Sequence, residues 1–128
     1  NNALWLRNGY DRAVEKGDLS ALTDFDHYVN VASQIDQSIV GTTTSDGVAI
    51  KGYVSHFIDR IIGSYEQKRE GVDIQDVLNA LQNPDSIKDT MRSSGIGRQY
   101  ITKNCKVVLN PENGKLIQVS PRKRREIM

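Results

Sequence analysis

The chain has 128 residues, of which 38% are hydrophobic and 26% charged, and its formal net charge at neutral pH is +1. This length suits a single domain that buries a hydrophobic core without disulfides or structural metals. One cysteine excludes an internal disulfide and a thiolate metal site, and two histidines are too few for a multi-histidine site, so we expect no metal and no cofactor. No apolar run approaches the ~20 residues that span a bilayer, so we expect no membrane span.

The first part of the chain predicts two helices. Apolar side chains recur on one face of the first, which ends at Gly17. The second begins after a cap at Asp18 or Ser20 and carries Leu22 on its apolar face.

The polar segment 41–47, GTTTSDG, is typical of a flexible connector and marks the boundary between two subregions. We therefore divide the chain into a helical lead-in or entry region, residues 1–45, and a second region, residues 46–128. We expect the lead-in to contribute little to any catalysis.

Two more helices follow the connector. In VSHFIDRIIGSYEQKR, apolar residues from Val54 to Ile62 keep the spacing of a core-facing helix. Asp73 then has the character of an N-cap for a helix that begins at Ile74, and Pro84 lies beyond its end.

The remaining chain predicts strands. Short segments rich in β-forming residues are separated by turn residues, with Asn113-Gly114 the strongest turn signal. These segments are SIKDTMR, RQYITKN, KVVLN and KLIQVSP, and their expected core residues are Val107, Leu109, Leu116 and Val119. Helices followed by strands predict an α+β fold, with a small antiparallel sheet of about four strands after the N-terminal helices.

Charge divides the chain unevenly. Residues 1–49 hold three basic and seven acidic side chains, whereas residues 98–128 hold eight and two. Such asymmetry favours an anionic partner for the C-terminal part. Alternatively, the run Arg122–Arg125 is only a solvated tail.

His56 and Arg60 are four residues apart and share one side of their helix, opposite the apolar stripe. This placement excludes a core role for His56 in an ideal helix and leaves a solvated residue or a functional one. An imidazole and a guanidinium together suit proton transfer beside a phosphate.

In the strands, Arg98, Tyr100 and Thr102 point to one side of the sheet, and Gln99 and Lys103 to the other. Gln118 and Ser120 also share a side, so we expect one face to present arginine, tyrosine, threonine and amide groups together. An ordinary polar sheet face is the competing interpretation.

The segment from Ser55 to Pro121 resembles the barnase–EndoU–colicin–RelE superfamily of nucleases. The similarity lies in a Ser-His with Arg four residues later, a helix ending before Asn-Pro, a Gly-Arg-Gln segment, and VVLNPENGKLI. The branch it most resembles occurs as C-terminal toxin domains of contact-dependent inhibition systems and other bacterial polymorphic toxins, and in some phage head proteins.

The resemblance implies a metal-independent ribonuclease domain at residues 46–128, with tRNA as the usual substrate. The implied catalytic residues are His56, Arg60, Arg98, Tyr100 and Thr102, and the implied substrate-binding residues are Gln99, Lys103, Gln118, Ser120, Arg122, Lys123 and Arg124. Relatives commonly have threonine where this chain has Gln118, so either Gln118 supplies that donor or Thr102 or Ser120 does.

The resemblance also implies a setting. The opening Asn1-Asn2 is similar to the end of the junction that precedes such toxin regions. We therefore expect an effector fragment that is secreted or displayed at the cell surface and acts in the cytoplasm of a target bacterium. Its partners would be RNA, a cognate immunity protein and, in some similar toxins, elongation factor Tu. The alternatives are a DNase of the same fold and a non-catalytic nucleic-acid-binding or phage virion module.

Overall fold

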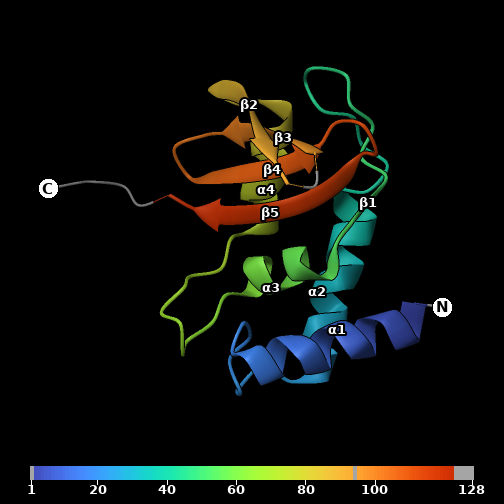
Figure 1. Ribbon diagram of the computed structural model, residues 1–128, viewed down its shortest axis with the longest axis vertical. Coiled ribbons are helices and arrows are strands. Elements are labelled where there is room, and N and C mark those ends of the chain that lie inside the picture. Colours follow the sequence, from blue (N-terminus) through green and yellow to red (C-terminus); the bar gives the residue numbers. More distant parts are fainter. Residues whose placement is uncertain (1, 94, 123–128) are drawn as a thin grey trace, which may run out of the picture.

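The computed structural model describes residues 2–93 and 95–122 (Figure 1). Four helices are present in this part of the chain: α1 (Asn2–Lys16), α2 (Phe25–Ser38), α3 (Ser55–Ile62) and α4 (Ile74–Gln82). The strands are β1 (Gly52–Tyr53), β2 (Ser86–Arg92), β3 (Gly95–Ile101), β4 (Cys105–Asn110) and β5 (Lys115–Pro121). The predicted α+β fold is confirmed.

The strands form one sheet in the order β1-β5-β4-β3-β2. The four predicted strands are all present and pair antiparallel, as expected. The prediction missed β1, which pairs parallel with β5 at the sheet edge. Two residues are too few to show an alternating pattern, so no sequence signal marked this strand.

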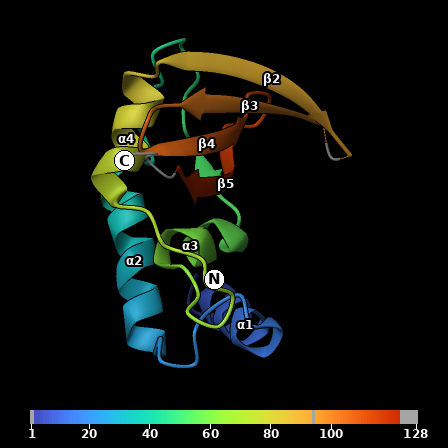
Figure 2. The same ribbon diagram turned by 90° about the vertical axis from the view of Figure 1, so that its left-hand side faces the viewer.

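Helices cover one face of the sheet. α4 packs against β4, and α3 packs against β5. α1 and α2 in turn pack on α3, so α3 lies between the sheet and α1 (Figures 1 and 2). Among the described residues, no helix covers the other face of β2–β5 (Figure 2).

The helix ends follow local capping chemistry. Asp73 caps α4 as predicted, its side chain accepting from the backbone N–H of Gln75. The predicted start of the second helix was wrong, because Asp24 caps α2 and accepts from the N–H of His27. Ser20 instead accepts from the N–H of Leu22 in a local turn, and Leu22 is 88% exposed. A hydroxyl can satisfy a turn as readily as a helix end.

A single hydrophobic core joins the helices to the sheet. It combines Tyr28 and Ile35 of α2 with Phe57 of α3 and strand residues. All the strand residues expected in the core are buried, namely Val107, Leu109, Leu116 and Val119. The expected regions 1–45 and 46–128 therefore share one core.

The segment 41–47, expected to be a flexible connector, is held by backbone hydrogen bonds. Backbone bonds join Gly41 to Ile50, and the N–H of Ser45 donates to the carbonyl of Leu81 at the end of α4. The segment thus lies against the sheet end of the molecule, where it contributes a carboxylate, Asp46, to the contacts described below.

Candidate functional site

His56 sits in the first turn of α3 between a carboxylate and a guanidinium. Its Nε2 accepts a hydrogen bond from Nε of Arg60 at 2.9 Å, and its Nδ1 lies 3.5 Å from Oδ2 of Asp59. Because Nε2 accepts, the neutral imidazole carries its proton on Nδ1, facing Asp59. The side chain is 41% exposed, so His56 lies on the polar side of its helix as predicted.

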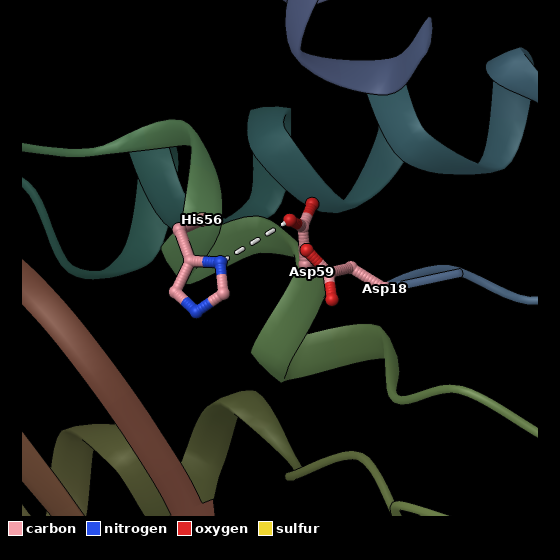
Figure 3. A group of neighbouring side chains, drawn as sticks. All are labelled: Asp18, His56 and Asp59. Atoms are coloured by element: carbon pink, nitrogen blue, oxygen red, sulfur yellow. Dashed lines mark ion pairs between the residues drawn. The ribbon is translucent and has the colours of Figure 1, made fainter. Parts of the chain in front are cut away.

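Asp59 is the unusual member of this group because it is only 5% exposed. Burial raises the pKa of its carboxyl group, and the contact with His56 partly opposes that rise. Its Oδ1 is buried and has no hydrogen-bond partner within the described part of the chain. Asp18, from the loop between α1 and α2, completes the cluster shown in Figure 3.

A pocket of about 150 Å³ opens beside this cluster. The first helix supplies much of its wall, including Arg12 and Lys16, so the supposed lead-in borders His56 directly. Its lining residues are Gly9, Arg12, Ala13, Lys16, Asp18, Ser55, His56 and Asp59.

Arg98 and Tyr100 lie on the helix-covered face, where other groups already bind them. The Tyr100 hydroxyl donates to Asp46 at 2.7 Å, and Arg98 forms ion pairs with Asp89 at 2.7 Å and Asp46 at 3.2 Å. Burial raises the pKa of Tyr100 to about 12, and its bond to Asp46 acts in the same direction. These contacts anchor the 41–47 segment to β3.

Thr102 is buried in the turn between β3 and β4. Its hydroxyl donates to the carbonyl of Cys105 and accepts from the N–H groups of Asn104 and Cys105. Arg122 donates to the carbonyl of Thr102 at 2.8 Å. Thr102 therefore holds a turn, and Lys103 is exposed at that turn.

The open face of the sheet carries a different set of side chains. The strand register places Lys88, Gln99, Val108 and Gln118 in one row across β2–β5. The next row contains Ser86, Ile101, Lys106 and Ser120. None of the paired strand residues that face this side, from β2 to β5, is an aspartate or glutamate. Within the described chain, the strands therefore give the open face basic side chains and no carboxylates.

Arg92 extends this basic face because a glycine makes room for it. A Cβ on Gly97 would lie 2.7 Å from Cδ of Arg92, so a side chain at residue 97 would displace the arginine stem from its place across β3. The Arg92 guanidinium then reaches Oε1 of Gln118 at 3.5 Å. A depression of about 370 Å³ lies on the same face between Lys88, Lys106 and Arg122.

The predicted composite face does not exist as expected. Gln99, Gln118 and Ser120 lie on the open face, whereas Arg98 and Tyr100 lie on the covered one, so the amide groups are separated from the arginine and tyrosine. His56 and Arg60 occupy a third place, on α3 beside α1. Lys123 and Arg124 fall outside the described residues.

Sequence reasoning also missed several residues of these surfaces. Asp59 was detectable, because its spacing of three from His56 places both on one side of a helix. Asp18 was not, because only the tertiary fold brings it to α3. Lys88 and Lys106 were visible as cations within predicted strands, but only the strand register places them on the same face as Gln99 and Ser120.

None of the helices in the described part of the chain has the length and apolar character needed to cross a membrane. No protein-family model, curated protein or solved structure matches this chain.

Proposed function

We propose that the protein is an endoribonuclease that binds RNA on the open face of its sheet and cleaves it with His56. The observation that carries the proposal is the open face, where Lys88, Arg92 and Lys106 stand among amides and hydroxyls without a carboxylate. Cations of this kind bind phosphates, and amide and hydroxyl groups supply further hydrogen bonds to backbone or base.

α3 packs against the covered side of β5, the strand whose other side carries Gln118 and Ser120 on the open face. RNA bound on the open face would therefore have to pass round the β1–β5 edge of the sheet to reach His56. Asp59 holds Nδ1 of the imidazole, which leaves Nε2 as the atom that exchanges protons. An acidic residue that orients an imidazole in this way is a common arrangement in acid–base catalysis.

The proposed reaction needs only side chains of this chain. Nε2 of His56 takes the proton of a ribose 2′-hydroxyl as its oxygen attacks the adjacent phosphorus. The bond from phosphorus to O5′ breaks, and the imidazolium returns a proton to that oxygen. Arg60, which now donates to Nε2, moves to the phosphate when the substrate binds and stabilises the charge of the transition state.

The products would be a 2′,3′-cyclic phosphate and a 5′-hydroxyl, with no divalent ion involved. Incubation of total RNA and of plasmid DNA with the protein, with and without EDTA, tests this directly. We expect RNA cleavage that EDTA does not reduce. Loss of cleavage in EDTA, restored by a divalent ion, would contradict the mechanism, and cleavage of the plasmid would instead indicate a DNase.

His56→Ala is the decisive variant. A positioned acid or base contributes about 10²–10⁴-fold in rate, so single-turnover cleavage should fall by that factor while RNA binding is retained. His27→Ala is the matched control, because His27 is an exposed residue of α2. Cleavage by folded His56→Ala at close to the parental rate would refute the assignment.

A binding module without catalysis is the second candidate. It is favoured by the separation of the expected catalytic residues, since Arg98 and Tyr100 are held by Asp46 on the covered face. This candidate predicts salt-sensitive RNA binding and no product in the same assay.

The biological setting of the enzyme rests on the resemblance to bacterial toxin nucleases. On that basis we propose a tRNA-cleaving toxin that is delivered into neighbouring bacteria and neutralised by an immunity protein with an acidic surface. Elongation factor Tu is a further partner to test. Expression in bacterial cells should arrest growth and produce cleaved tRNA, and co-expression of the immunity protein should prevent both.

A further inference from the structure

Asp18, His56 and Asp59 form a cluster of potential metal ligands between α1 and α3. One ligand atom of each residue lies within 4.8 Å of those of the other two. The side chains come from different parts of the chain, with Asp18 reaching α3 from the loop that follows α1 (Figure 3). The pocket of about 150 Å³ described above gives the cluster an opening to solvent.

The buried carboxylate of Asp59 offers an unused ligand atom at this place. Asp59 is only 5% exposed, and none of the described residues forms a hydrogen bond with its Oδ1. Carboxylates that are buried in proteins are normally paired with a cation or bound to a metal. Among the described residues, His56 alone forms an ion-pair contact with the carboxylate of Asp59, and a neutral imidazole does not compensate its charge. Arg69 also acts on this carboxyl group through its charge, without an ion-pair contact.

We propose that Asp18, His56 and Asp59 bind a divalent transition-metal ion such as Zn²⁺, and that this ion switches the nuclease off. The donor set of one imidazole nitrogen and two carboxylate oxygens suits Zn²⁺ better than Mg²⁺ or Ca²⁺, which prefer oxygen ligands throughout. The distance from Nδ1 to Oδ2 is already 3.5 Å. Ligands of a tetrahedral Zn²⁺ lie about 3.4 Å apart, a separation that this pair already has.

The inhibitory effect rests on the proposed function and follows from the imidazole chemistry. A metal on Nδ1 requires the lone pair of that atom, so the proton of the neutral ring moves to Nε2. Nε2 can then neither accept from Arg60 nor take a proton from the substrate. The metal also occupies Asp59, which would otherwise orient the ring.

Arg12 and Lys16 disfavour metal binding, because both line the pocket. Their charges lower the affinity of the site for any cation, and Lys16→Ala should therefore tighten Zn²⁺ binding. This effect has the opposite sign to the loss of a ligand, so the two kinds of variant are easily distinguished.

The test uses the untagged chain and Zn²⁺ alone as the probe. Calorimetric titration should give one Zn²⁺ per chain, and Zn²⁺ should raise the melting temperature. Asp18→Asn should weaken binding at least about tenfold, as expected for the loss of one charged ligand, while Asp26→Asn, an exposed aspartate of α2, should bind like the parent. Failure to bind, or equal binding by Asp18→Asn, would overturn the site.

Cleavage assays then test the second part of the proposal, the inhibition of the nuclease by Zn²⁺. Asp18 takes no part in the proposed reaction, so Asp18→Asn should cleave RNA as the parent does and resist Zn²⁺ concentrations that inhibit the parent. Zn²⁺ that binds without inhibiting, or that activates, would overturn this half. A parent that never cleaves RNA would refute the proposed function, while the binding results would still decide the metal site.

Discussion

Both faces of the sheet carry basic and polar side chains, but the two faces differ in whether these side chains are paired with carboxylates. On the covered face, Arg98 and Tyr100 are engaged by Asp46 and Asp89, so their charges and donors are already used within the protein. On the open face, Lys88 and Lys106 have no carboxylate opposite them in the strand register. Residue type alone therefore does not identify a binding surface, and the decisive property is whether a polar group is already paired.

This difference predicts that side chains on the two faces contribute to different properties, stability on one face and ligand binding on the other. Groups on the covered face should matter for stability and have little effect on ligand binding. Groups on the open face should matter for binding and have little effect on stability, because isolated surface charges contribute little to folding. Each half of this statement can be tested separately.

The largest effect is expected on the open face. The double variant Lys88→Gln, Lys106→Gln should weaken RNA binding about tenfold at moderate salt and reduce the salt dependence of the binding constant, because each lysine neutralises a phosphate. The melting temperature should not change. The matched control is Lys51→Gln, Lys68→Gln, which removes the same charge from exposed positions outside the sheet rows. Equal losses in both double variants would mean that only net charge matters.

On the covered face, Tyr100→Phe should reduce stability. The change removes a donor from the buried side of the sheet and leaves Asp46 with one bond fewer, which costs about 1–3 kcal/mol in the free energy of unfolding. Urea denaturation measures this difference. RNA affinity should be unchanged, and a variant of parental stability that fails to bind RNA would return Tyr100 to the binding site.

The smallest effect concerns Asp46 and acid. Burial alone would raise its pKa, but hydrogen bonds from Thr44 and Tyr100 and the charge of Arg98 outweigh burial and hold the pKa below the ordinary value of 3.8. A carboxyl group with a lowered pKa stabilises the folded state above its ordinary pKa, and this contribution is lost as the pH falls through the folded value.

Asp46→Asn should therefore lose less stability than the parent between about pH 5 and about pH 3. Chemical denaturation across this range gives the comparison, and Asp26→Asn serves as the control on α2. Parallel stability curves for Asp46→Asn and the parent would show that the contact contributes nothing through its charge.

The sequence predicted the strands well because their signals are local. Segments rich in β-forming residues, separated by turn residues, mark the four predicted strands, and the turn before β5 contains Gly114 with φ of +74°, a conformation that favours glycine. A side chain at that position would also collide with the carbonyl of Ala49, at 2.4 Å. Local patterns of this kind need no knowledge of the fold.

The site was predicted less well because it depends on contacts between distant residues. The alternation of side chains along a strand correctly predicted that Arg98 and Tyr100 share one face of the sheet. No pattern in the strand sequences reveals that Asp46 contacts both residues. In the same way, His56 and Asp59 can be paired from their spacing on one helix, whereas Asp18 joins them only through the packing of α1 on α3. Sequence patterns give the direction of a side chain, and the fold decides what it meets.

The position of β5 has a consequence for how the chain folds during synthesis. This strand pairs with β1 and β4 and packs against α3. β1 and α3 are synthesised much earlier, and they can form these contacts only after β5 has been made. The hydrophobic core that the helices share with the sheet is complete only after the ribosome has produced Leu116 and Val119. Contacts between such distant segments slow folding, and we expect nascent chains that stop before β5 to be cut rapidly by proteases and to depend on chaperones.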